Sequence, residues 1–357
     1  MPMKHLLPLP LLFCLCACGP EVEAFDPPAR VSIPPEAVTA SFGEMSDASG
    51  TEILSSPWVA ALSESGRYLA VGDRAPPFLR ILDRETGAVR AFGPEGQGPG
   101  ELMSAYGLDF VGDSTLLVLS AGQRLDRFNV QGEWLGGQRL RETGVLVMSI
   151  TVACGSRIFA YGVPFGYRQM DTVPWLHELA FGTGVSAEER LRIPGRGFLV
   201  GFGGLYGLDG KEDGVLLWHK AREPQLGYWL PCHGGVASVW SHTTSREVVE
   251  QRITLEGGDY GGSVLVLPDT LFYGAAAFGS TKIHARFAFK PGDGIPVTRF
   301  HTVQGELCRE VDIFGGWRLH DAHRDGLVVS AYEPYPIVQV IDWEWFRASL
   351  TRVKCSG

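Results

Sequence analysis

The sequence predicts an all-β protein, a six-bladed β-propeller built from four-stranded antiparallel blades. Short apolar or alternating runs, joined by polar turns, recur along most of the chain, and long amphipathic helical patterns do not. These runs also pair in a regular way, because two hairpins recur with a period of about 50 residues. Two hairpins make one four-stranded sheet, which is the repeating unit of a propeller.

The first hairpin of each unit is a strand, a short polar turn and a β-branched or aromatic strand. These hairpins are expected at residues 58–63 with 68–72, 107–111 with 115–120, 149–153 with 157–162, 203–208 with 214–219, 263–267 with 270–275, and 313–319 with 326–331. The second hairpins are expected to turn near Glu85, Gln131, Thr183, His233, Gly292 and Trp343. Two antiparallel sandwiches, the alternative architecture, would not give such matched pairs of hairpins.

Residues 38–42 are predicted to be an outermost strand without a blade of its own. The segment Ala40-Ser41-Phe42-Gly43 is echoed by Arg90-Ala91-Phe92-Gly93, at the outer end of the first unit. The last unit supplies only three inner strands, so this N-terminal strand is expected to complete it and leave no open sheet edge. The propeller then spans residues 37–343, and residues 344–357 are a C-terminal addition, either a short helix or an extra strand.

The amino terminus predicts export and lipidation. Residues 1–17 carry one cation, Lys4, before an apolar run that is too short to span a bilayer. Leu15-Cys16-Ala17-Cys18 resembles the bacterial lipobox, which implies a lipidated Cys18, with acyl chains such as palmitate anchoring the protein in a membrane. Because Gly19 rather than Asp follows, the resemblance implies the outer membrane, with the propeller in the periplasm or at the surface. Residues 18–36 contain Pro27, Pro28, Pro34 and Pro35 and are expected to be a tether. The alternative is an ordinary secretory signal.

Residues 92–102, Phe-Gly-Pro-Glu-Gly-Gln-Gly-Pro-Gly-Glu-Leu, lie between the first and second units. This segment resembles a signature of bacterial six-bladed propeller proteins related to NHL repeats. The resemblance covers residues 38–135, with only the hairpin rhythm beyond, and it implies a fold rather than an activity. The Gly-rich loop lacks the Lys-Ser/Thr of a phosphate-binding loop and opens no helix, so a nucleotide site is not expected.

Charge and cysteines restrict the partners. A net charge of −9 disfavours nucleic acid, which requires a basic face. An oxidising periplasm permits one or two disulfides. The sequence leaves open the pairing, and whether the thiols stay free, among Cys154, Cys232, Cys308 and Cys355. Their wide spacing fits no metal-ligand pattern, and no cofactor can be assigned.

A cationic rim is the first candidate binding site. Propeller ligands are expected near the axis, on the face formed by the blade-to-blade connections and the loops that join the two hairpins of a blade. Those loops carry a cation in five successive units, namely Arg74, Arg124, Arg168, Arg222 and Lys282. Such a rim would favour an anionic ligand, because the guanidinium fork binds carboxylate or phosphate. The alternative is that each cation is bonded to nearby carbonyl groups.

Aromatic residues near the same face are a second candidate feature. They are Tyr161, Phe165, Tyr167, Tyr332 and Tyr335. Such side chains could stack on a sugar or peptide, although packing in the core is their commoner use.

Catalytic patterns are scarce. GxSxG and HExxH are absent from the sequence. His219, at a strand end near the expected pore, is the acid/base candidate, but its partner cannot be identified. The segment His320-Asp321-Ala322-His323 looks metal-like, yet neighbours on a strand point to opposite faces. One asparagine, Asn129, cannot supply the ligands of a calcium-centred lactonase.

The sequence therefore predicts an envelope binding module for a protein, glycan or small anionic ligand. One alternative is a propeller enzyme, either a lyase, a hydrolase or a quinone-dependent oxidoreductase, whose residues converge from separate blades. Another is a purely structural envelope component.

Overall fold

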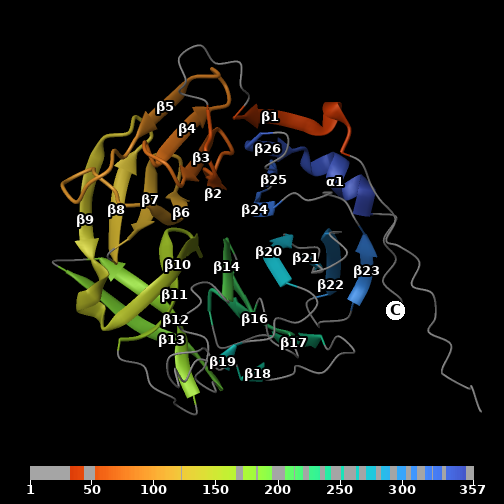
Figure 1. Ribbon diagram of the computed structural model, residues 1–357. Coiled ribbons are helices and arrows are strands. Elements are labelled where there is room, and N and C mark those ends of the chain that lie inside the picture. The colour runs from red at the N-terminus through yellow and green to blue at the C-terminus, as the bar shows by residue number, and fades with distance from the viewer. Residues whose placement is uncertain are drawn as a thin grey trace, which may run out of the picture.

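The computed structural model describes much of the chain beyond residue 32 (Figure 1). The described residues are 33–43, 53–121, 123–165, 172–181, 184–194, 206–212, 214–219, 225–233, 238–242, 251–252, 263–264, 271–278, 283–289, 296–302, 307–311, 318–323, 325–331 and 335–350. The predicted signal segment, Cys18 and most of the predicted tether lie outside them.

The described strands form six antiparallel four-stranded sheets and one two-stranded sheet. The first sheet comprises β2 (Pro57–Leu62), β3 (Tyr68–Asp73), β4 (Leu79–Asp83) and β5 (Val89–Phe92). The second comprises β6 (Ala105–Val111), β7 (Thr115–Ser120), β8 (Arg124–Asn129) and β9 (Trp134–Arg139), and the third β10 (Val145–Ala153), β11 (Arg157–Pro164), β12 (Thr172–Phe181) and β13 (Val185–Pro194). The fourth comprises β14 (Tyr206–Lys211), β15 (Gly214–His219), β16 (Gln225–Pro231) and β17 (Ser238–His242). The fifth comprises β20 (Leu271–Phe278), β21 (Ile283–Phe289), β22 (Pro296–Thr302) and β23 (Leu307–Val311).

The sixth sheet joins the two ends of the described chain. It contains β24 (Arg318–His323), β25 (Gly326–Ala331), β26 (Ile337–Ile341) and the N-terminal strand β1 (Val38–Phe42), in the order β1-β26-β25-β24. Two short 3-10 turns, η1 (Pro35–Ala37) and η2 (Leu140–Thr143), and one helix, α1 (Trp343–Leu350), complete the described elements with the pair β18 (Gln251–Arg252) and β19 (Ser263–Val264). Within the described residues, no helix is both long and apolar enough to cross a membrane.

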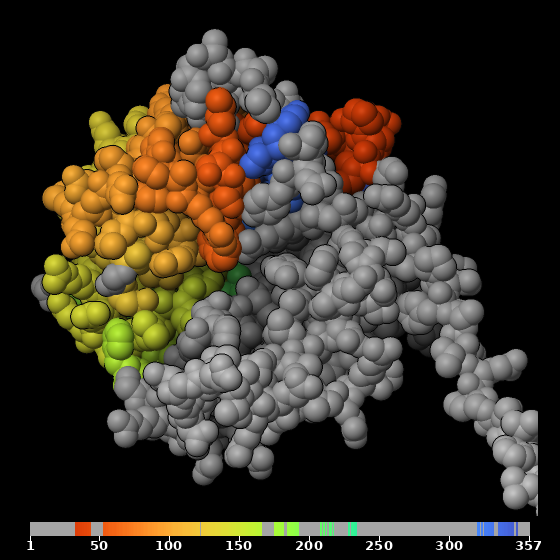
Figure 2. Space-filling view, in the orientation of Figure 1, coloured from red at the N-terminus to blue at the C-terminus, as the bar shows by residue number. Residues whose placement is uncertain are grey.

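The sheets are arranged around a common centre, with the first strand of each sheet innermost (Figure 1). These first strands contact one another in the cyclic order β2, β6, β10, β14, β20, β24 and back to β2. Four-stranded antiparallel sheets arranged radially in this way are the architecture of a β-propeller. The described side chains of the first three sheets form one continuous surface (Figure 2).

The hydrophobic core lies between neighbouring sheets. Strand β3 is buried from Leu69 to Asp73, and strand β7 from Leu116 to Ser120. Both strands have nearly continuous apolar sequences because both of their faces are covered, as in any sheet that is sandwiched between two others. Between the first and second sheets, Leu79, Leu102 and Phe128 belong to one buried cluster.

Strand β1 is packed as well as paired. It runs antiparallel to β26, with Ser41 opposite Gln339 and Phe42 opposite Val338. Phe42 is only 2% exposed and belongs to the buried cluster between the first and sixth sheets, so the strand contributes a core side chain besides its hydrogen bonds. Arg84 in the first sheet also donates a hydrogen bond to Thr39 Oγ1 at 3.0 Å.

The fifth sheet corrects one sequence prediction. The expected hairpin of residues 263–267 with 270–275 is wrong, because β19 pairs with β18 and β20 pairs with β21. The expected second turn near Gly292 therefore falls between β21 and β22, and the turn near Trp343 is replaced by helix α1. Alternating hydrophobicity identifies a strand but does not state its place in a sheet, and the polar connection before residue 263 hid the shift.

Candidate functional site

Four of the six first strands share a distortion where they begin. A register shift leaves one extra residue in β2, β6, β10 and β20, namely Trp58, Tyr106, Met148 and Tyr273. Strand β14 pairs without a shift, and the extra residue of β24 is His320, further along the strand. Each first strand forms a hairpin with the strand that follows it. In these four strands the extra residue lies five residues before the last residue that is hydrogen-bonded in that hairpin, and the same count gives Tyr206 in β14 and Arg318 in β24. We call these six positions, 58, 106, 148, 206, 273 and 318, the mouth ring.

The mouth ring lies on one face of the propeller, the upper face, on which every first strand begins. β-bulges re-aim side chains and are common next to functional sites. Tyr106 is 52% exposed, although it sits in an innermost strand. Trp58 is partly buried, and Met148 packs against the core between the third and fourth sheets. For Tyr206, Tyr273 and Arg318 the structure gives the backbone position only. The described part of the ring therefore presents aromatic surface near the axis.

Arg74 is the predicted cation that joins this site. It begins the loop between β3 and β4, is exposed, and its guanidinium carbon lies 4.0 Å from the centroid of the Trp58 ring. Its backbone N–H donates to Asp73 Oδ1 at 2.7 Å, and the same carboxylate accepts the N–H groups of Ser55 and Ser56. The backbone beneath Arg74 is thus fixed, and a cation–π contact places its guanidinium beside the mouth ring.

The guanidinium of Arg124, in contrast, is hydrogen-bonded to neighbouring protein groups. Its Nε donates to Asp126 Oδ2 at 2.7 Å, one terminal nitrogen donates to Gln97 O at 2.8 Å, and the other donates to Glu101 O. Asp126 is fully buried and also accepts the indole N–H of Trp134 at 3.0 Å. The guanidinium therefore holds the Gly-rich loop against the second sheet. These bonds match the alternative in which a loop cation is held by nearby carbonyl groups, and ligand binding by Arg124 stays a prediction.

The remaining predicted cations, Arg168, Arg222 and Lys282, lie outside the described residues. That they line the same mouth as Arg74 therefore stays a prediction.

The other predicted site residues differ in their location and exposure. His219 ends β15 directly opposite Tyr206 of the mouth ring, and its side chain lies outside the described residues. Tyr161 is 2% exposed and stacks on Trp175, so it is a core residue, whereas Phe165 is 41% exposed beyond the end of β11. Tyr335 is partly buried, and Tyr167 and Tyr332 lie outside the described residues.

Carboxylates lie one layer below the mouth ring. Three residues further along each first strand are Ala61, Asp109, Thr151, Asp209, Ala276 and Asp321. Asp109 Oδ2 accepts Thr151 Oγ1 at 2.9 Å and Val152 N at 2.7 Å, both from the third sheet. Asp321 Oδ2 accepts Leu62 N of the first sheet at 3.0 Å. Asp109 and Asp321 therefore each tie their own first strand to the next one around the ring.

The two carboxylates also interact electrostatically. Burial, and to a smaller extent the negative charge of Asp321, together raise the pKa of Asp109 from 3.8 to about 7. Hydrogen bonds from Val152, Thr151 and Phe110 act in the opposite direction, but burial and like-charge repulsion outweigh them. Asp109 thus changes its charge near neutral pH while serving as a link between sheets.

The side chains of the metal-like segment near residue 320 are hydrogen-bonded to different partners. His320 Nε2 lies 2.7 Å from Ser330 Oγ, Asp321 faces Leu62, and His323 Nε2 lies 2.9 Å from Glu64 O. Among the residues that the structure describes, no group of three His, Cys, Asp or Glu side chains is placed to hold a metal ion.

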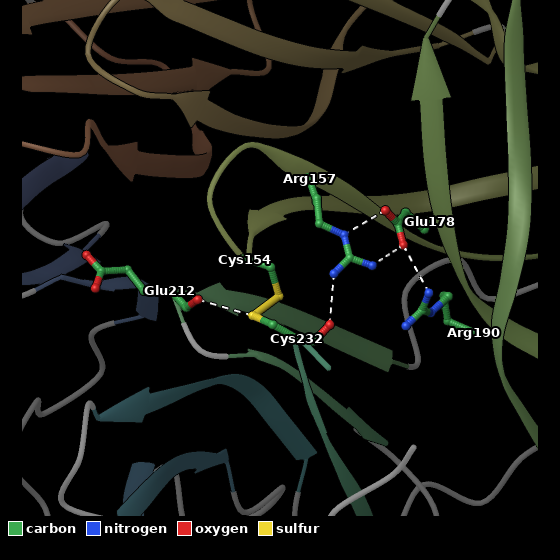
Figure 3. Close-up of a disulfide and its surroundings, with 6 residues drawn as sticks. All are labelled: Cys154, Arg157, Glu178, Arg190, Glu212 and Cys232. Atoms are coloured by element: carbon green, nitrogen blue, oxygen red, sulfur yellow. Dashed lines mark hydrogen bonds and ion pairs between the residues drawn. A yellow bond between two sulfur atoms is a disulfide. The ribbon is translucent and has the colours of Figure 1, made fainter. Parts of the chain in front are cut away.

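A disulfide joins the third and fourth sheets (Figure 3). Cys154, directly after β10, is bonded to Cys232, directly after β16. Arg157 reinforces the junction, because its guanidinium donates to both oxygens of Glu178 and, at 2.9 Å, to the carbonyl of Cys232. Of the pairings that the sequence left open, this one is formed. Cys308 lies in β23, and Cys355 lies outside the described residues.

Comparisons with known proteins show the fold alone. No protein-family model matches the sequence, and no curated protein matches it. A Bacteroides fragilis protein described as exported superposes with a TM-score of 0.54 at 10% identity, over 84% of this chain and 87% of its own. The β-propeller domain of Swd1 from Myceliophteria thermophila superposes with a TM-score of 0.45 at 14% identity, over 81% and 98%. Hydrazine synthase from Kuenenia stuttgartiensis gives 0.45 at 11%, over 81% and 96%.

The mouth ring was not found by sequence reasoning, although a signal for it exists. Counting back five residues from the last hydrogen-bonded residue of each first hairpin gives aromatic residues at 58, 106, 206 and 273. The count requires strand ends that only the pairing register supplies, because a bulge leaves no distinctive residue type in the sequence.

Proposed function

We propose that this protein is a lipid-anchored, extracytoplasmic six-bladed β-propeller that binds a ligand at the mouth ring. The cyclic contacts of the six first strands support six blades. The pairing of β1 with β26 supports closure of the ring by the N-terminal strand, which removes an exposed edge from the sixth sheet.

Two features support a location outside the cytoplasm. The Cys154–Cys232 disulfide links parts of the chain that are 78 residues apart, and such bonds persist in oxidising compartments. The signal-like segment and the lipobox-like Cys18 precede the propeller in the sequence. The similarity in fold to an exported protein agrees with this proposal.

Lipidation is expected to depend on Cys18 alone. Cys18→Ser should abolish metabolic palmitate labelling and release the protein from membranes, because the acyl chains supply the anchor. Cys16→Ser is the matched control and should leave both label and membrane fraction unchanged. Label that persists on the Cys18→Ser variant would contradict the anchor.

The exposure of Tyr106 in an innermost strand is the observation that carries the binding function. Large exposed aromatic side chains on rigid strands lose little conformational entropy when they contact a ligand. An isolated exposed apolar residue needs no explanation, but here a cation–π pair, Arg74 with Trp58, also lies near the axis on the same face.

A photo-crosslinking side chain at position 106 is expected to capture a ligand in intact cells. Leu135 is the matched control, because it is 50% exposed against 52% for Tyr106 but lies on the outermost strand of the same sheet. Mass spectrometry of the purified protein should show an adduct at position 106 and none at position 135. Equal labelling of both positions, or of neither, would overturn binding at the mouth ring.

A further inference from the structure

We propose that the mouth ring recognises an acidic sugar, the carboxylate of a uronic-acid residue pairing with Arg74 while its ring stacks on the neighbouring aromatic side chains. This proposal rests on the binding function proposed above and names the class of ligand.

The aromatic positions favour a sugar ring. Tyrosine and tryptophan offer an apolar face together with a polar edge, which suits a pyranose that has one C–H face and a rim of hydroxyl groups. Tyr106 is exposed, Trp58 lies at the same level of the next strand, and tyrosines occupy the equivalent backbone positions 206 and 273. Because these residues belong to strands rather than loops, their backbone is fixed before the ligand arrives.

The charge favours an acidic sugar. Two arginines close to the core are paired with carboxylates, Arg80 with Asp73 at 3.1 Å and Arg157 with Glu178. In the described part of the chain, the side chain of Arg74 contacts an aromatic face instead of a carboxylate. A guanidinium stacked on an indole keeps its in-plane donors available, and those donors match a carboxylate in a bidentate arrangement.

A peptide is the less favoured occupant. Extended peptides add to exposed sheet edges, whereas at the centre of this propeller the first strands contact one another. Stacking positions that surround an axis fit a compact ring better than an extended chain.

Binding of a galacturonic-acid tetrasaccharide to the purified mature protein, measured by calorimetry, tests the proposal. A galactose tetrasaccharide is the neutral probe, and a glutamate tetrapeptide is the acidic probe without sugar rings. We expect the uronate to bind most tightly and its affinity to fall as salt is added, since exposed charges are screened. Tyr106→Ala should weaken uronate binding about tenfold, the size expected when one aromatic stacking partner is lost.

Arg74→Gln separates charge from stacking. It should weaken uronate binding about tenfold and leave galactose binding unchanged, because one charge-assisted pair is lost. Leu135→Ala is the control for both variants and should bind as the unmodified protein does. Equal affinity for uronate and galactose would overturn the role of Arg74, and tighter binding of the glutamate peptide would overturn the sugar. If no probe binds while position 106 still crosslinks in cells, the ligand class is wrong and the binding function stands; if both fail, both proposals fall.

Discussion

Deletion of residues 19–43 is expected to lower the free energy of unfolding by more than about 5 kcal/mol, or to prevent folding. The deletion removes β1 and the buried side chain of Phe42. Burying a phenylalanine in a core is worth about 3–5 kcal/mol, and each lost ladder hydrogen bond adds about 1 kcal/mol. It also uncovers the edge of β26, so we expect association of the truncated protein as well.

The matched control is deletion of residues 19–32, which ends before η1 and the buried Ala37. Urea unfolding of that shorter deletion should match the mature protein. Phe42→Ala keeps the strand and should lower stability by about 3–4 kcal/mol, whereas Ser41→Ala should change it by less than about 1 kcal/mol. Closely similar unfolding midpoints for the two deletions would refute a structural role for β1.

Stability is expected to fall as pH rises from about 4 to about 7, with Asp109 as a principal cause. Its pKa in the folded protein is about 7 against 3.8 in the unfolded chain, so the folded state holds one more proton within this window. The unfolded state binds fewer protons there, and the free energy of unfolding therefore decreases with pH. A full shift corresponds to about 4 kcal/mol, and partial exposure of the residue makes about 2–4 kcal/mol the expected range.

Asp109→Asn should remove most of this slope, because the amide retains an acceptor oxygen for Thr151 and Val152 but carries no charge. Asp109→Ala should lower the free energy of unfolding by about 3 kcal/mol at pH 5, where Asp109 is protonated in the unmodified protein and no buried charge destabilises it. The loss should be smaller at pH 8, because the unmodified protein then carries that charge. Asp113→Asn is the control, since that exposed carboxylate also accepts a hydrogen bond from the neighbouring sheet, at Ser65 N. Chemical unfolding across this pH range measures all three variants. An unchanged slope in Asp109→Asn would show that the pH dependence originates elsewhere.

The strands themselves were predictable because propeller sheets are buried on both faces. Tyr68–Asp73 and Thr115–Ser120 have the largely apolar composition that such burial demands. Strand β1 was found from its likeness to the end of β5, since both are outermost strands that precede a Phe-Gly turn. The place of β20 was missed because its neighbours in sequence, β18 and β19, interrupt the hairpin rhythm.

The candidate site was less predictable. Arg74 begins the loop after β3 and Arg124 follows the equivalent loop as the first residue of β8. They look alike in sequence, yet Arg74 lies on Trp58 and Arg124 is held by Asp126 and three carbonyl groups. Contacts between neighbouring sheets decide whether such an arginine stacks on an aromatic ring or is held by carboxylate and carbonyl groups. Sequence periodicity carries no information about those contacts. The link from Asp109 to Thr151 and Val152 has the same long-range character.

The Cys154–Cys232 bond has a consequence for proteolysis. It encloses the second, third and fourth strands of the third sheet and the first three strands of the fourth. A single cut anywhere between the two cysteines therefore releases no fragment, because both pieces stay covalently connected beside their partner strands. Six strands of the propeller are in this way protected from being lost after one nick, and a protease must cut at least twice, or act together with a reductant, to remove them.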